Sequence, residues 1–156
     1  MSLTVPALFD HVGLAPVGPV RWRAPVPCSA KGVYVIAMSA APSQDWFLPC
    51  PEFTPSLEER WGLTARWLPD QPVLYIGKTD RTVRHRLGQF YAHRFGQRSP
   101  HAGGQRILVL PMIENAKVFW AGAAEPLATE RAMLAHFKDV VGSLPFANGT
   151  RAKQKR

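Results

Sequence analysis

Two tyrosines in short β-prone runs, followed by an arginine-rich segment, are the residues of this chain best suited to chemistry. Residues 31–36 contain Tyr34, and residues 73–79 contain Tyr75 just before a glycine and a lysine. The basic segment that follows includes Arg86. A guanidinium binds phosphate oxygens, and a phenol hydroxyl can orient a water molecule. Two tyrosines on strands beside an arginine on a helix could therefore bind and orient a phosphodiester.

The spacing of apolar residues predicts the elements that carry these groups. Residues 32–38 and 73–77 read as strands, and Tyr34 should share a face with Gly32 and Ile36. A helix should begin near residues 80–82, with its buried face made of Val83, Leu87 and Phe90. Arg86 lies one step round from that face, at the edge of the core. A lone arginine at such a position is usually a solvated surface residue, so its role depends on the other motifs.

Less regular segments surround these elements. Residues 1–30 form a proline-rich extension that should pack on the core, with a short helix around residues 8–12. Residues 39–72 form a long insertion, in which Ser56 could cap a helix that ends before the turn at 69–72. The insertion could recognise a substrate or extend the core as a lid. The sequence does not separate these two alternatives.

A basic, glycine-containing loop follows the arginine helix. Residues 94–106 contain no acidic residue, and their composition suits a flexible loop that contacts phosphates or a merely solvated loop. Residues 107–110 form an apolar run that could be strand or buried helix, and residues 117–120 predict a third strand.

A helix over residues 126–139 contains the most informative carboxylate. Its apolar stripe is expected to consist of Leu127, Leu134, Phe137 and Val141, and Glu130 falls on the same stripe. Burying a carboxylate among core residues is costly unless a cation or hydrogen-bond donors meet it. A divalent metal ion or Arg86 could be that partner, or the carboxylate could reach water at the margin. Glu125 should complement the helix dipole.

Composition limits the class of protein. The chain has 156 residues, enough for a single domain, and a net charge of +8 from 19 basic and 11 acidic residues, which favours a polyanionic partner. Cys28 and Cys50 have no zinc-site spacing and should be idle thiols. No signal peptide or membrane-spanning run is evident, so we expect a soluble cytoplasmic protein. Residues 150–156 should form a basic, disordered tail.

Five short motifs, taken in their order along the chain, resemble the motifs of the GIY-YIG nuclease family. They are a Gly-Val-Tyr strand, a Tyr-Ile-Gly-Lys strand, a helix with Arg-Leu, a glutamate helix and a closing Pro-x-x-Asn, running from Gly32 to Asn148. Each motif alone is weak, and the order makes the resemblance specific. It implies a small α/β (α+β) fold over residues 31–149, a three-stranded sheet flanked by helices, and it favours helix for residues 107–110.

The resemblance also implies roles for individual residues. Tyr34 and Tyr75 would be the paired tyrosines, one of them a general base or a group that orients the attacking water. Arg86 would stabilise charge on the phosphate, Glu130 would hold a single Mg²⁺ or Mn²⁺ ion, and Asn148 would tie down the site, although Asn148-Gly149 is also a turn signal. Substrate-binding residues are expected to be Lys78, Arg81, Arg84, His93, Arg94 and Arg98.

Three departures from the family pattern matter. The two tyrosines are 75 − 34 = 41 positions apart, a spacing that the insertion explains. The step from Tyr75 to Arg86 is longer than usual, which leaves the register open between His85 and Arg86. The histidine often found one turn after the arginine is replaced by Phe90, and His93 is a candidate substitute.

The resulting expectation is a metal-dependent endonuclease that hydrolyses DNA by water attack, without a covalent intermediate. RNA remains an alternative substrate. The main rival is a catalytically inactive nucleic-acid-binding module with the same fold, and a third reading is a basic protein–protein adaptor. The complete set of two tyrosines, arginine, glutamate and asparagine favours the enzyme, because a pure binder has no need for a carboxylate that faces the site.

Overall fold

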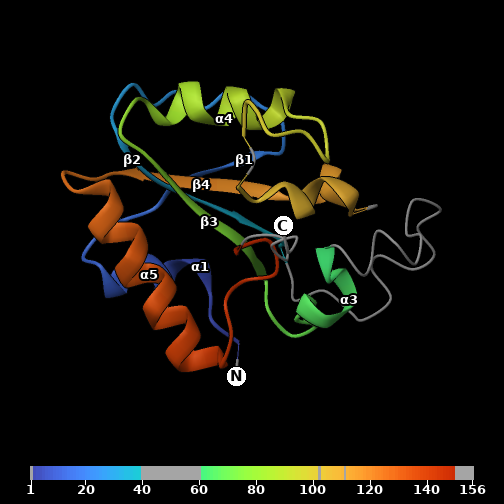
Figure 1. Cartoon of the computed structure of the whole chain (residues 1–156). Coiled ribbons are helices and arrows are strands. Elements are labelled where there is room, and N and C mark those ends of the chain that lie inside the picture. The colour runs from blue at the N-terminus through green and yellow to red at the C-terminus, as the bar shows by residue number, and fades with distance from the viewer. Residues whose placement is uncertain (1, 40–60, 102, 111, 150–156) are drawn as a thin grey trace, which may run out of the picture.

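The structure is a computed structural model that describes residues 2–39, 61–101, 103–110 and 112–149 (Figure 1). The start of the helix expected from Ser56, the thiol of Cys50 and the tail at 150–156 lie outside the described residues, whereas the end of that helix is described and contains a short helix, Leu63–Arg66. Cys28 has a free thiol. None of the described helices is both long and apolar enough to cross a bilayer.

The fold is α+β and is centred on an antiparallel sheet. The strands are β1 (Val17–Arg21), β2 (Gly32–Ala37), β3 (Val73–Thr79) and β4 (Lys117–Gly122), and their order across the sheet is β1-β4-β2-β3. The expectation of three strands was therefore wrong, because the proline-rich N-terminal segment supplies the fourth strand. The other three strands were predicted, although β3 runs to Thr79 rather than ending at Gly77.

Pro19 explains why β1 was not predicted from the sequence. Pro19 lies within β1, and the register shifts between Val17 and Val20 where β1 pairs with β4. Proline cannot donate to a ladder and is confined to edge strands or bulges. Since β1 is an edge strand with an irregularity at this point, it accommodates a residue that argues against a strand when read from sequence alone.

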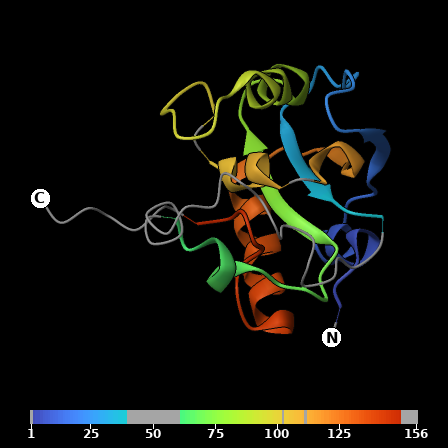
Figure 2. The ribbon, with the colours of Figure 1, turned by 90° about the vertical axis from the view of Figure 1, so that its right-hand side faces the viewer.

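Helices cover both faces of the sheet (Figures 1 and 2). Helix α4 (Val83–Ala92) lies on one face, while α1 (Val5–His11) and α5 (Pro126–Val141) lie together on the other. The sides of β2 divide as expected, with Tyr34 and Ile36 in the core under α4 and Val33 and Val35 in the core beside α5. The core under α4 also takes residues from α3 (Leu63–Arg66) and from the 3₁₀ helix Gln105–Val109.

Local signals fix where the helices begin and end. Thr82 caps α4 by accepting a hydrogen bond from the backbone N–H of His85 at 3.0 Å, and Val83, Leu87 and Phe90 are buried as predicted. Gly142, with φ of 102°, ends α5 in the left-handed conformation. The apolar run at 107–110 lies largely in a 3₁₀ helix, so the helical alternative was the right one; a second 3₁₀ turn, Ile113–Asn115, follows.

The apolar stripe of α5 differs from the one expected. Leu127 was placed on it but is 43% exposed, whereas Pro126, Met133 and Phe137 are buried. The prediction was wrong at Leu127 only, since Phe137 is buried and Leu134 and Val141 pack against the same core. Glu130 still falls on this stripe, four residues after Pro126 and three before Met133, and is half-buried.

The outer edge of β3 is closed by the segment that follows α5. The backbone N–H of Ala147 donates to the carbonyl of Leu74 at 2.9 Å. The Asn148 side chain then pairs with Ile76 twice: its Oδ1 accepts from the Ile76 N–H at 2.9 Å, and its Nδ2 donates to the Ile76 carbonyl at 2.8 Å. The amide of Asn148 therefore acts as one more unit of strand backbone.

Two arginines bind the closing segment, which we define as residues 147–149. Arg66 donates to the carbonyl of Asn148 at 2.9 Å, and Arg106 donates to the carbonyl of Gly149 at 2.8 Å. Arg106 is buried and lies over the ring of Trp61, at 5.3 Å from its centroid. Burial, and then the charge of Arg66, lower the pKa of Arg106 to about 10, so it stays cationic at neutral pH. Arg106 is thus a structural residue of the fold rather than part of a solvated loop.

We predict that Asn148→Ala lowers the free energy of unfolding by about 2–4 kcal/mol, since it leaves two buried backbone groups of Ile76 unmet. Urea denaturation measures the change. Asn115→Ala is the matched control, because Asn115 is exposed and should change stability little. Equal stability of the two variants would show that the β3 edge does not depend on Asn148.

Candidate active site

The sheet brings the two predicted tyrosines together on one face. Tyr34 of β2 lies opposite Gly77 of β3, and Tyr75 lies opposite Ile36, so the tyrosines are diagonal neighbours. Their ring centroids are 6.1 Å apart and their planes are tilted by 49°. Both are buried, at 1% exposure for Tyr34 and 8% for Tyr75.

Gly77 leaves the space that the Tyr34 ring occupies. A Cβ atom at position 77 would lie 2.4 Å from Cζ of Tyr34 and 2.6 Å from its hydroxyl oxygen. Any side chain here would displace the phenol from the sheet, because real Cβ atoms do not approach other atoms so closely. The glycine in the Tyr-Ile-Gly run is therefore required by the partner tyrosine, inside the strand rather than at its end.

His101 completes the cluster, although the sequence analysis gave it no catalytic role. Its Nε2 lies 2.6 Å from the Tyr34 hydroxyl, and its ring stacks on Phe90 at 4.0 Å between centroids and 16° between planes. Phe90 occupies the position at which the resemblance predicts a histidine. The imidazole of His101, which comes from the loop, stacks on the ring at that position. No periodicity pointed to His101, since it belongs to an irregular loop.

Arg86 faces the same cluster from α4. Its guanidinium donates to the Gln89 side chain and to the Pro100 carbonyl, both at 2.9 Å. Its charge and its hydrogen bonding lower the pKa of Tyr34, so the cation lies beside the phenol. His85, the alternative in the register, is exposed and lies beside Arg81 at 3.3 Å. The structure thus favours Arg86 as the arginine of the cluster.

Burial dominates the electrostatics of both tyrosines. Removal from water raises the pKa of Tyr34 well above 10, and the proximity of Tyr75 raises it further, against the effect of Arg86. Burial also raises the pKa of Tyr75, followed by the negative charge of Glu130, while Arg86 opposes both. Desolvation favours the neutral phenol in each case. In this arrangement both tyrosines are protonated at neutral pH.

His101 is neutral in the same environment. Burial, and then the charge of Arg86, lower its pKa to about 3, while the nearby backbone of Gly103 partly opposes them. A backbone group that raises the pKa of a histidine is an acceptor close to a ring N–H. Nδ1 is buried and has no hydrogen-bond partner in the described part of the chain, while Nε2 faces the Tyr34 hydroxyl. We assign the proton to Nδ1, so that Nε2 accepts the hydrogen bond of the Tyr34 hydroxyl.

Glu130 approaches from the opposite face of the sheet. It lies on α5, which packs against β3, and its charge raises the pKa of both tyrosines. Its own pKa is raised by burial, while Lys78 and then Arg131 lower it. No cluster of three or more His, Cys, Asp or Glu side chains occurs in the described ranges. A single half-buried carboxylate fits Mg²⁺, which keeps several waters and uses one or two carboxylates together with substrate phosphates.

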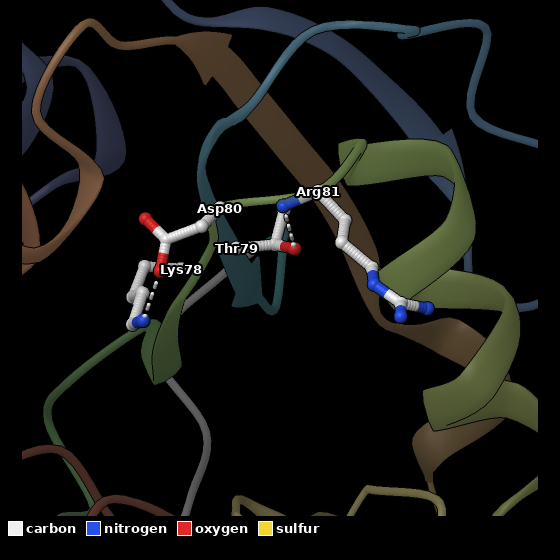
Figure 3. A network of polar contacts seen from close by, with 4 residues as sticks. All are labelled: Lys78, Thr79, Asp80 and Arg81. Carbon is white, nitrogen blue, oxygen red and sulfur yellow. Dashed lines mark hydrogen bonds and ion pairs between the residues drawn. The ribbon is translucent and has the colours of Figure 1, made fainter.

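Lys78 and Arg81 diverge at the end of β3 (Figure 3). Lys78 forms an ion pair with Asp80 at 2.9 Å, and its charge reaches Glu130. The Arg81 side chain extends along the start of α4, while its backbone N–H donates to the Thr79 hydroxyl at 3.1 Å. Lys78 therefore belongs to the face of Glu130, and Arg81 to the face of the tyrosines.

The other basic residues predicted to bind substrate separate into two groups. Arg84, Arg94 and Arg98 are exposed, on α4 and on the loop after it. His93 is buried and 5% exposed; its Nδ1 accepts from the His101 N–H at 2.9 Å, and its Nε2 lies 3.2 Å from Oε1 of Gln105. Both ring nitrogens thus have internal partners, and His93 supports the loop that carries His101.

No protein-family model matches this chain, and neither curated proteins nor solved structures give a significant match. The resemblance to GIY-YIG nucleases therefore stays a hypothesis that rests on the motifs.

We predict that Gly77→Ala destabilises the protein by about 1–3 kcal/mol, because the new methyl group forces the Tyr34 ring to move. Gly88→Ala is the matched control: Gly88 lies in α4 with open space where a methyl group would point, so this substitution should stabilise by up to about 1 kcal/mol. Urea denaturation of both variants measures whether each substitution lowers or raises the free energy of unfolding. Gly77→Ala with unchanged stability would contradict the tight contact.

We predict that acid destabilises the fold through His101. Its folded pKa of about 3 is depressed, so between pH 6.5 and pH 3 the unfolded chain binds the proton and the native state does not. The free energy of unfolding should fall as the pH drops through this window, by up to about 1.4 kcal/mol per pH unit. Urea denaturation at pH 7 and pH 5 measures the slope. His101→Asn should flatten it, whereas His85→Asn, at an exposed position, should not; equal slopes would contradict the assignment.

Proposed function

We propose that this protein is a metal-dependent endonuclease of the GIY-YIG type that hydrolyses phosphodiester bonds of DNA. The observation that carries the proposal is the convergence of Tyr34, Tyr75 and Arg86 on one face of the sheet, within reach of the charge of Glu130. These groups come from elements that are distant in the sequence. A sheet with helices on both faces can form without a cation and two phenols at one buried point.

The chemistry assigned to the residues follows from their positions. Arg86 would bind a non-bridging phosphate oxygen and stabilise the charge that develops there. Tyr34 or Tyr75 would orient the attacking water, which adds its oxygen to phosphorus as the bond to the leaving oxygen breaks. The water loses one proton, and the leaving alkoxide gains one. A tyrosine can accept a proton only after its own pKa falls, so it must first lose the apolar surroundings that raise it.

Glu130 would hold the divalent ion, which when bound supplies Lewis-acid stabilisation of the phosphate. A carboxylate with few protein partners suits this role, since Mg²⁺ retains much of its hydration. Lys78, whose charge reaches Glu130, would compete with the ion or assist on the phosphate. Asn148 would hold β3, and hence Tyr75, in register.

Exposed arginines support DNA as the partner. Arg81 and Arg84 lie at the start of α4, and Arg94 and Arg98 lie on the loop after it. They would contact phosphates on either side of the scissile bond, in keeping with the net charge of +8. RNA carries the same phosphates and remains an alternative substrate.

The test is nicking of supercoiled plasmid and of branched DNA, with Mg²⁺, Mn²⁺ or EDTA. We expect metal-dependent nicking that Glu130→Gln and Arg86→Ala each reduce by about 100-fold or more. Glu125→Gln is the matched control, because it removes the same charge from an exposed position at the start of the same helix and should leave nicking unchanged.

Two outcomes would contradict the proposal. Nicking that survives Glu130→Gln would show a contaminant or a different metal ligand. Salt-sensitive binding of DNA without any nicking would instead support the rival function, a nucleic-acid-binding module that keeps the fold but lacks turnover.

A further inference from the structure

One loop lies over every group of the proposed site on the face under α4. We define the cover segment as residues 99–101 together with Gly103 and Gly104. The Pro100 carbonyl accepts from the Arg86 guanidinium at 2.9 Å, and the His101 ring meets the Tyr34 hydroxyl at 2.6 Å. A Cβ atom on Gly104 would lie 2.7 Å from Cε1 of Tyr75, so this backbone, with φ of 77°, lies directly on the second tyrosine ring.

The cover segment leaves no space for a phosphodiester at the tyrosines. Tyr34 and His101 are 1% and 0% exposed. The Pro100 carbonyl also occupies an N–H of Arg86, the type of donor that a phosphate oxygen would use. Charged acceptors form hydrogen bonds roughly twice as strong as neutral ones, so a phosphate would be the better partner of Arg86.

The same contacts keep the tyrosine in the wrong protonation state for catalysis. The Tyr34 hydroxyl donates its proton toward Nε2 of a neutral His101, and burial favours the protonated phenol. Neither member of this pair changes charge near neutral pH. Water or a phosphate that replaced the cover segment would remove the desolvation and give water access to the hydroxyl oxygen.

In the described part of the chain, hydrogen bonds to three side chains hold the cover segment in place. The His101 N–H donates to Nδ1 of His93 at 2.9 Å, and Gln105 then links His93 to the preceding turn by accepting from the Gly96 N–H at 2.7 Å. Ser99 and Pro100 are exposed on the outer side. Opening would break these hydrogen bonds and the stacking of His101 on Phe90, and it involves none of the backbone pairs between β2 and β3.

We propose that the cover segment is an autoinhibitory element, in which the Pro100 carbonyl holds the phosphate position on Arg86 until a nucleic-acid phosphate displaces it. The inference rests on the proposed function for the identity of the ligand. The protein then binds its substrate in an open state that is sparsely populated without ligand, so its apparent affinity is reduced by the open fraction.

The test compares binding of a short DNA duplex in EDTA, where cleavage is absent, between wild type and Gln105→Ala. Loss of the Gln105 links should raise the open fraction, so we expect about five- to tenfold tighter binding, the effect of one or two buried hydrogen bonds. Gln97→Ala is the matched control, since it removes an exposed side chain and keeps the carbonyl to which Gln105 donates. Arg86→Ala added to Gln105→Ala should abolish the gain.

Hydrogen exchange and tyrosine nitration measure the opening of the cover segment directly. Exchange at the His101 amide should be faster in Gln105→Ala, and nitration of Tyr34 should rise with it, while Tyr91 reports any global unfolding. If Gln105→Ala does not fold, His101→Ala takes its place, because it removes the contact with Tyr34.

Faster exchange at the His101 amide with no gain in affinity, including no binding at all, would overturn the inference. So would DNA bound to wild type while Tyr34 stays protected from nitration. Failure of the proposed function would give a different result. Opening and tighter DNA binding without any metal-dependent nicking would contradict the nuclease function and still support the autoinhibitory role of the cover segment.

Discussion

The outer edge of β3 is the constraint on which the rest of the site depends. An edge strand has backbone donors and acceptors that lose water when the core forms, and each must find a partner. In β3 these partners are Ala147 and the side chain of Asn148, which reach it only after the chain has passed through α5. The closing segment therefore couples the strand that carries Tyr75 to the helix that carries Glu130.

Close packing decides the chemistry on the face under α4. Gly77 lets the Tyr34 ring lie against the strand, and Gly104 lets the loop backbone lie against Tyr75. The consequence of such contacts is desolvation, which raises the pKa of both phenols and lowers that of His101. Arg86, whose charge opposes the rise in both phenols, is shared with the Pro100 carbonyl. Packing thus stabilises a neutral, closed arrangement.

Elements with local signals could be predicted from the sequence, and features set by tertiary contacts could not. The alternation around Tyr34 and the 83–87–90 spacing of α4 each describe one element, and both predictions were confirmed. Strand β1 was missed because its proline is tolerated only at a sheet edge, and Leu127 was misplaced in the first turn of α5, where Pro126 is the buried residue. His101 and the buried Arg106 lie near each other in the chain, yet one meets Tyr34 and the other meets the closing segment. Composition alone made both look solvated.

In the proposed site, the group that would bind a phosphate is distinct from the groups that would activate water. In the proposed mechanism, Arg86 would exchange a neutral carbonyl for a charged oxygen. That exchange would move the backbone that carries His101 away from Tyr34, because Pro100 and His101 are adjacent in the chain. Ligand binding and a change in the tyrosine environment would then be one event. The Tyr34 hydroxyl, which is shielded from water beside His101, would become accessible to a water molecule once Arg86 binds the better acceptor. Such coupling would restrict reactivity to moments when a phosphodiester is present, which suits a site with a strong cation and reactive phenols in one small fold.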